Sequence, residues 1–283
     1  MIKADVLYIG YPRSGSTYLR AYFRNHPQML YDDQQIAEIL YQPLSYKHEP
    51  INKPNGKVYI SCDESICESV CVTGRPEIWG KYLYRPGCFN LVRHDILIDP
   101  KEAARRMKAV HPNAKVLMVI RNQVDWFESI YKAVITSLPP NQRSFHDYWL
   151  CPQGIAMRVA GHHDRVISAW ATAYSDLLVL RHERLMDSQT SQLLCNWLGV
   201  DHVPFPPQRI NESHAGVTYL HQMFPFLSQS PHAIKSLLKP LTKYIPGKHN
   251  AVLTADDREM IRDLYKESNE RTAHWENWRK LPQ

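Results

Sequence analysis

Long hydrophobic runs are missing from this 283-residue sequence. No stretch approaches the roughly 20 uninterrupted apolar residues that a membrane-spanning helix needs, so the sequence predicts no membrane span. The brief apolar run at residues 6–9 ends at a glycine, which is typical of a buried first strand and not of a signal peptide. We therefore expect a soluble, cytoplasmic protein.

Paired cysteine motifs are also missing. The six cysteines form no CxxC pair, and we expect them to be mostly reduced thiols. One group, Cys62, Cys67, Cys71 and His94, could be considered as zinc ligands, but its spacing matches no common ligand frame. The sequence therefore predicts no metal site.

The composition favours one large domain and one site. With 44% hydrophobic residues, the chain can bury a sizeable core, and residues 1–283 fit a single domain. Within it, residues 41–98 suit an excursion on the acceptor side, and residues 208–283 are expected to be mainly helical. The formal charge of +6 favours anionic ligands, although a solvated basic surface has the same composition.

Hydrophobic patterns and helix signals alternate along the chain. Strands are expected at 6–9, 58–62, 89–93, 115–120 and 177–180, and helices at 18–26, 33–40, 99–110, 124–136, 191–198 and 254–269. Asp32 and Asp33 are suited to cap the second helix, and Gly199 is suited to end the fifth. The alternation predicts a three-layer α/β fold, a parallel sheet flanked by helices, with ligands at the carboxyl ends of the strands.

A further helix is expected to open at the His-His-Asp segment 162–164. The apolar residues at 166, 167, 170 and 174 form its core stripe. We expect the two histidines to be cap or surface groups and neither metal ligands nor catalytic residues.

The segment from Gly10 to Thr17 nearly fits the phosphate-loop pattern GxxxxGK[ST]. It differs at Ser16, which stands where nucleotide triphosphatases keep a lysine, while Arg13 supplies a cation inside the loop. The pattern predicts a P-loop-like phosphate-binding loop that holds an anion through backbone N–H groups and hydroxyls, but not a magnesium triphosphate. Its expected ligand residues are Arg13, Ser14, Gly15, Ser16 and Thr17.

This loop also resembles that of a known family. The segment Tyr11-Pro-Arg-Ser-Gly-Ser-Thr-Tyr-Leu19 is similar to the 5′-phosphosulfate loop of sulfotransferases that use 3′-phosphoadenosine-5′-phosphosulfate (PAPS). The Arg-Asn-Gln-x-Asp-Trp segment at 121–126 and the Asp-Glu-Ser turn at 63–65 resemble bacterial members of the family. Where cytosolic members carry lysine, this chain has Arg13. An arginine can neutralise charge on the bridging oxygen, but it does not release a proton.

A second segment carries the same resemblance. Lys115-Val-Leu-Met-Val-Ile-Arg-Asn-Gln-Val-Asp-Trp-Phe-Glu-Ser129 is similar to the family's 3′-phosphate segment, which implies that Arg121 and Ser129 hold a phosphate. The spacing is physically reasonable, because Arg121 ends a strand and Ser129 lies on the helix that follows. Weaker similarity implies that Arg209 contacts the PAPS donor. It also implies that residues 180–185 and 194–199 are part of the scaffold.

The resemblance implies an enzyme that moves a sulfuryl group from PAPS to a hydroxyl or amine of an acceptor, a small natural product or a glycan, and releases 3′-phosphoadenosine 5′-phosphate (PAP). It implies two alternative general bases. Glu64 follows a strand, as the base of some sulfotransferases does, and His94 ends the next apolar stretch, as the base of the cytosolic enzymes does. The sequence indicates no oligomeric state.

Two other functions fit parts of the pattern. An atypical P-loop kinase is disfavoured by Ser16 and by the lack of an acidic strand end for magnesium. A non-catalytic module that binds a nucleotide or a polyanion would use the same loop. Aromatic residues between basic ones at 79–85 suggest stacking on nucleic acid, but no recognised nucleic-acid motif occurs.

Overall fold

The structure is a computed structural model, and it describes residues 4–11, 13–32, 55–62, 100–134, 144–150, 152–207 and 253–275. The strands in these ranges are β1 (Val6–Tyr8), β2 (Met29–Asp32), β3 (Val58–Cys62), β4 (Lys115–Ile120) and β5 (Leu177–Arg181). The helices are α1 (Ser16–Asn25), α5 (Pro100–Val110), α6 (Gln123–Val134), α7 (Phe145–Leu150), α8 (Pro152–Ala160), α9 (His163–Ala173), α10 (Ser188–Leu198) and α13 (Ala255–Thr272), with the short 3-10 turns η4 (His182–Arg184) and η8 (Ala273–Trp275). No helix in the described part of the chain has both the length and the apolarity that crossing a bilayer requires.

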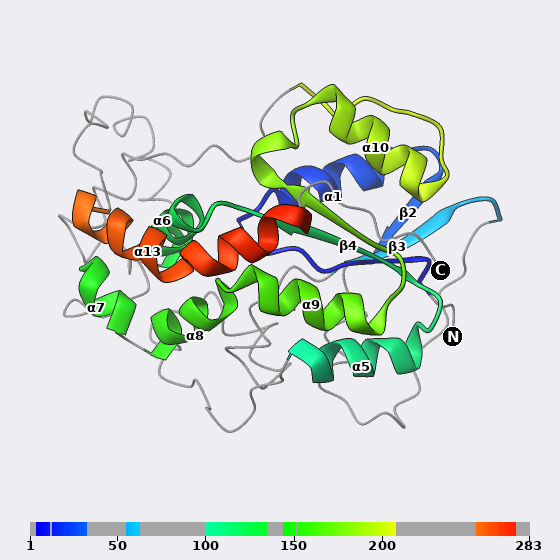
Figure 1. The fold of residues 1–283 in the computed structure, drawn as a ribbon. Helices are drawn as coiled ribbons and strands as arrows, with labels where there is room; N and C mark the ends of the chain where they lie inside the picture. Colours follow the sequence, from blue (N-terminus) through cyan, green and yellow to red (C-terminus); the bar gives the residue numbers. More distant parts are fainter. Residues whose placement is uncertain are drawn as a thin grey trace, which may run out of the picture.

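The strands form one parallel sheet in the order β2-β3-β1-β4-β5 (Figure 1). From β1 the chain moves outward to β2, returns through β3, and then crosses to β4 on the other side of β1. The strand order therefore reverses between β1 and β4. In open parallel sheets, the crevice at the carboxyl ends of such strands is the usual place for a ligand.

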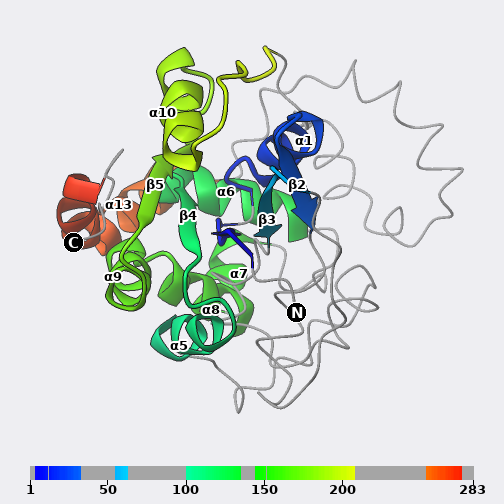
Figure 2. The ribbon, with the colours of Figure 1, turned by 90° about the vertical axis from the view of Figure 1, so that its right-hand side faces the viewer.

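Helices cover both faces of the sheet. On one face, α1 and α10 pack against alternate strand residues that include Tyr8 and Leu117. On the other face, α5, α6, α9 and α13 pack against the intervening residues, among them Leu7 and Met118. Figures 1 and 2 show α1 and α10 on one side of the sheet and α5, α8 and α9 on the opposite side. The three-layer α/β fold expected from the sequence is confirmed.

Several local signals are confirmed residue by residue. The strand expected at 115–120 is β4, buried at every position after Lys115. Helix α10 ends at Leu198, and Gly199 follows in the left-handed conformation with a φ of 75°. At the start of α13, the Thr254 side chain accepts from the Asp257 N–H, and the Asp257 carboxylate accepts from the Thr254 N–H. These ends are specified locally, which is why the sequence alone predicts them.

The strand β2 was not expected. Asp32, interpreted from the sequence as a helix cap, is instead the last residue of this strand, and Met29 to Asp32 pair in parallel with Val58 to Ser61 of β3. Unlike the apolar runs read as strands at 6–9 and 177–180, this segment ends in the acidic pair Asp32-Asp33, which was read as a helix start. It forms because β3 supplies hydrogen-bond partners from a distant part of the chain. The strand expected at 89–93 and the rest of the helix expected at 33–40 lie outside the described residues.

The cap of α13 provides a test of this fold. We predict that Thr254→Ala lowers the free energy of unfolding by about 1 kcal/mol, because the first turn of α13 loses its side-chain acceptor. Thr254→Ser keeps the hydroxyl and should stay near the wild-type value. Urea unfolding of the three proteins measures the difference, and an alanine variant as stable as the serine variant would show that the cap contributes nothing.

Candidate anion-binding site

The loop after β1 remains attached to β4 beyond the last residue of the strand. The Ile9 N–H donates to the Leu117 carbonyl at 2.9 Å, and the Tyr11 N–H donates to the Val119 carbonyl at 3.3 Å. The Tyr11 ring is buried, and its hydroxyl donates to the Ala160 carbonyl at 2.9 Å. The first half of the loop is therefore fixed to the sheet on one side and to α8 on the other.

Two left-handed residues turn the loop into α1. Arg13 has a φ of 62°, and Gly15, the N-cap of α1, has a φ of 92°. Gly15 offers no side chain to the first N–H groups of α1, and no acidic residue lies in the first turn. Helix α1 therefore begins with backbone donors and a positive dipole end that no side-chain carboxylate of its own first turn neutralises.

The hydroxyls of this loop differ in exposure. Ser14 is fully buried, and its Oγ has no hydrogen-bond partner among the described residues. Ser16 is also buried, at 3% exposure, whereas Thr17 is half-buried. The sequence assigned all three as ligand donors, and Thr17 has the most accessible side chain of the three.

Three residues that the sequence analysis selected meet at the carboxyl ends of β1 and β4. The Arg13 Nε donates to the Ser129 Oγ at 3.2 Å, and the Arg121 Nη1 donates to the Arg13 carbonyl at 2.7 Å. Arg13 comes from the loop after β1, Arg121 from the end of β4, and Ser129 from α6. The two sequence segments, more than 100 residues apart, are thus joined at the reversal point of the sheet.

The Arg121 side chain is only half exposed, and burial is the main factor that lowers its pKa. The neighbouring Arg13 lowers this pKa further, while Asp125 and Glu183 raise it. An arginine nevertheless stays charged in a protein. Its Nε is buried without a hydrogen-bond partner in the described part of the chain, so Arg121 brings positive charge and an unused donor to this site.

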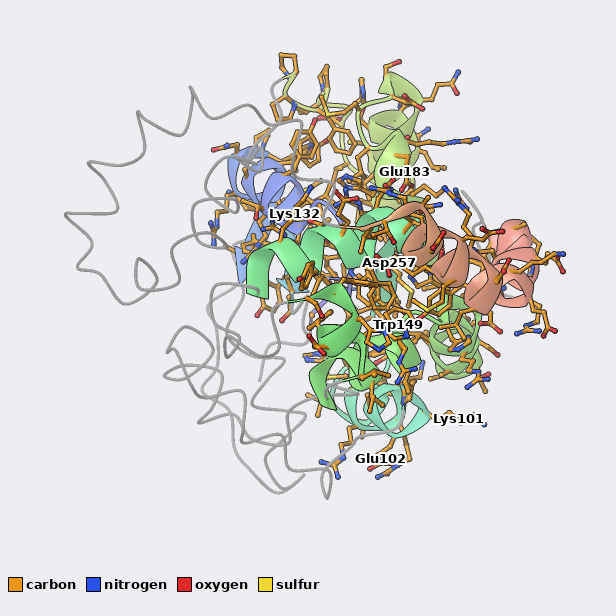
Figure 3. All side chains as sticks on the ribbon, turned by 90° about the vertical axis from the view of Figure 1, so that its left-hand side faces the viewer. Lys101, Glu102, Lys132, Trp149, Glu183 and Asp257 are labelled. Carbon is orange, nitrogen blue, oxygen red and sulfur yellow. The ribbon has the colours of Figure 1, made fainter. Side chains whose placement is uncertain are left out.

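The turn after β5 closes the same edge of the sheet. Glu183, labelled in Figure 3, accepts from the Asn122 N–H at 2.8 Å and so connects η4 to the end of β4. Asn122 in turn accepts from the Val124 N–H at the start of α6. The sequence analysis treated residues 180–185 as scaffold only. An acidic residue two positions after the end of β5 was the signal that this turn reaches the carboxyl edge.

His163 contradicts the sequence interpretation. It was expected at a cap or on the surface, but it is 2% exposed, and its ring centroid lies 4.7 Å from that of Tyr11. Burial, followed by the charge of Arg181, lowers its pKa to about 3, so the ring is neutral. The signal was its position four residues before Ile167, on the same helical face as the core stripe.

Some expected residues lie outside the described ranges. These are the two alternative bases, Glu64 and His94, the donor contact Arg209, and all of residues 63–98. Cys62, the one residue of the considered zinc group that is described, is buried. Within the described ranges, no group of three or more His, Cys, Asp or Glu side chains is placed to hold a metal ion.

Comparison with known proteins gives a likeness to solved structures but no sequence match. No family model matches the sequence, and no curated protein matches it. Among solved structures, the chain is similar to a sulfotransferase from Alicyclobacillus acidocaldarius, with a TM-score of 0.48 and 15% sequence identity. The match covers 84% of this chain and 97% of that one. A likeness at this level says nothing about activity, which has to be inferred from the residues of the site.

The geometry at Gly15 can be tested through stability. A Cβ at this position would lie 2.5 Å from the Leu185 Cδ1 and 3.1 Å from the His182 Nδ1, whereas nothing lies within 4 Å of one at Gly199. We predict that Gly199→Ala costs about 1 kcal/mol through its left-handed backbone alone. Gly15→Ala should cost roughly 1 kcal/mol more, because its new methyl group also clashes. Equal losses in urea unfolding would show that the loop does not pack against η4 as described.

Proposed function

We propose that this chain is a PAPS-dependent sulfotransferase that transfers a sulfuryl group to a hydroxyl or amine of an acceptor and releases PAP. The observation that carries the proposal is the meeting of Arg13, Arg121 and Ser129 at the reversal point of the sheet. A nucleotide with phosphates on both sides of its ribose needs two groups of donors at one crevice. The loop before α1 and the end of β4 are two such groups.

The loop and the start of α1 are suited to the 5′-phosphosulfate. Backbone N–H groups at a helix N-terminus bind phosphate well, and the left-handed Gly15 lets the backbone approach an anion closely. Arg13 adds a positive charge inside the loop, three residues before the position at which nucleotide triphosphatases keep their lysine. Thr17 adds a hydroxyl donor.

Arg121 and Ser129 are suited to the 3′-phosphate. The Arg121 guanidinium and the Ser129 hydroxyl both lie against Arg13, one through its carbonyl and the other through its Nε. A phosphate oxygen carries negative charge and is a stronger acceptor than either a carbonyl or a hydroxyl. In the proposed complex, the phosphate oxygen therefore replaces the internal acceptors of the Arg121 and Arg13 guanidiniums. Arg209 is proposed as an additional contact.

The proposed reaction is an in-line displacement at sulfur. The acceptor oxygen or nitrogen forms a bond to sulfur while the bond from sulfur to the bridging oxygen breaks, and the electron pair of that bond stays on the 5′-phosphate of PAP. Arg13 and the N-terminus of α1 stabilise this developing charge, and no metal is needed in the step. The acceptor is proposed to enter from the side of residues 41–98. A general base, Glu64 or His94, takes its proton.

Transfer of labelled sulfuryl from PAPS tests the function directly. We expect the purified protein to label one class within a panel of phenols, amines, alcohols and glycans, with PAP formed in equal amount. An acceptor class identified in this way also decides between a small natural product and a glycan. If PAP binds tightly but no acceptor is labelled and no PAPS is consumed, the chain is a nucleotide-binding module.

The assignment of the 3′-phosphate makes Arg121 the most informative donor residue. We predict that Arg121→Ala weakens PAP binding by about 1.5–3 kcal/mol, the usual value for a hydrogen bond to a charged group. Arg105→Ala is the matched control, since it removes the same charge from an exposed position on α5. Titration calorimetry that finds equal PAP affinity in the two folded variants would contradict the assignment.

The choice of base is tested with a pair of variants, Glu64→Gln and His94→Asn. We predict that one of them lowers kcat by roughly 10²-fold or more and leaves PAP affinity unchanged, because a general base acts on the acceptor proton and not on the donor. The other variant serves as its control. Full activity in both variants would remove both residues from the mechanism.

A further inference from the structure

A cavity of about 150 Å³ lies next to Arg121, at the carboxyl ends of β4 and β5. It is bounded by the first residues of α6 and α9 and by the last turns of α13. Its polar lining residues are Arg121, Asn122, Gln123, His163, Arg181, Asn269 and Thr272. Neither Arg13 nor Ser129 lines it, so it is not the crevice proposed above for the nucleotide.

The hydrogen bonds around the cavity leave donors unused. The Gln123 Nε2 donates to the Gly161 carbonyl at 3.2 Å and to the Asn269 Oδ1 at 2.8 Å. Because Oδ1 is the acceptor, the other end of the Asn269 amide is a donor. The Thr272 hydroxyl donates to the Ser268 carbonyl.

His163 contributes a second donor. The His163 Nδ1 lies 3.4 Å from the Gln123 Nε2, an amide nitrogen that cannot accept a hydrogen bond, so the proton of the neutral ring is assigned to Nε2. The Nε2 is buried and has no hydrogen-bond partner among the described residues. A buried N–H with no partner is costly, and it indicates a group that the cavity is suited to bind.

The charge of the cavity is also one-sided. The guanidiniums of Arg121 and Arg181 both line it, and none of its lining residues is a carboxylate. Carboxylates outside the lining act on this charge, since Asp125 and Glu183 raise the pKa of Arg121. Of these outer carboxylates, Glu183 accepts from the Asn122 N–H, and Asp164 accepts from Ser268 and Arg271. Two half-buried guanidiniums, with no acidic residue among the lining residues, favour an anion.

We propose that this cavity binds one small inorganic oxyanion, sulfate or phosphate, at a site separate from the proposed nucleotide crevice and adjoining it at Arg121. A cavity needs only roughly 15 Å³ for each water, so this one has room for a tetrahedral oxyanion with accompanying waters. Its ligands are the Arg121 and Arg181 guanidiniums, the His163 Nε2–H and the Asn269 amide. The proposal is independent of the reaction proposed above.

The test uses Asn269→Asp, which places a negative charge in the cavity while an oxygen still accepts from Gln123. The matched control is Asn196→Asp on α10, where the Asn196 Oδ1 also accepts from a glutamine, at 2.7 Å, but at an exposed position outside the cavity. Sulfate is titrated into each protein at constant ionic strength, set with sodium chloride, and its affinity is read from calorimetry and from the rise in Tm. Arg181→Gln is a second cavity variant should the first fail to fold.

We expect sulfate to bind the wild type and Asn196→Asp equally, and to bind Asn269→Asp and Arg181→Gln roughly tenfold or more weakly. The titration is repeated with saturating PAP, which blocks the nucleotide crevice. Sulfate binding that persists with PAP bound supports the proposal. Sulfate binding that PAP abolishes assigns the anion to the nucleotide crevice and overturns the proposal. If PAP itself does not bind, the proposed enzyme fails, but the comparison of Asn269→Asp with Asn196→Asp still decides on the cavity. Equal sulfate affinity in those two variants would refute the site.

Discussion

Parallel pairing of β1 with β4 brings together two strands whose following helices pack on opposite faces of the sheet. The loop after β1 turns toward α1 and the segment after β4 turns toward α6, so the two diverge and leave polar groups between them. The pairing continues past the end of β1, through the hydrogen bonds of Ile9 and Tyr11. Without it, Arg13 would have no fixed position relative to Arg121 and Ser129.

The arginine side chains at this edge of the sheet are oriented by hydrogen bonds to acceptors within the protein. Arg121 is attached to the Arg13 carbonyl, Arg13 to Ser129, and the turn after β4 to Glu183. Such bonds orient the arginines before any ligand arrives, which reduces the side-chain entropy that binding must overcome. This site also differs from that of a nucleotide triphosphatase, because Ser16 at the lysine position is buried and Arg13 supplies the cation from within the loop.

Most of the fold could be predicted from local sequence. The six residues of β4 are almost entirely apolar, Gly199 specifies a helix end, and Thr254 with Asp257 specifies a helix start. Each of these signals acts over a few residues, and each appears in the structure where it was expected. The strand β2 could not be predicted, since its stability comes from pairing with β3, which is distant in the sequence.

The candidate site was only partly predictable for a related reason. Arg13, Arg121 and Ser129 follow recognisable patterns, and the structure brings them together. His163 had a local signal in its spacing to Ile167, but Asn269 follows no pattern, because its environment is assembled from α6, α9 and α13. Asn269 resembles a surface residue in the sequence, and only the packing of distant helices reveals its contact with Gln123.

The dependence of nucleotide binding on magnesium tests the central claim most directly. If two arginines and a helix N-terminus hold the nucleotide, titration calorimetry should show PAP binding with the same affinity in the presence and absence of magnesium. ATP with magnesium should then bind no more tightly than ATP alone. Tight ATP binding that requires magnesium, with no response to PAP, would contradict the account and indicate a phosphoryl-transfer enzyme.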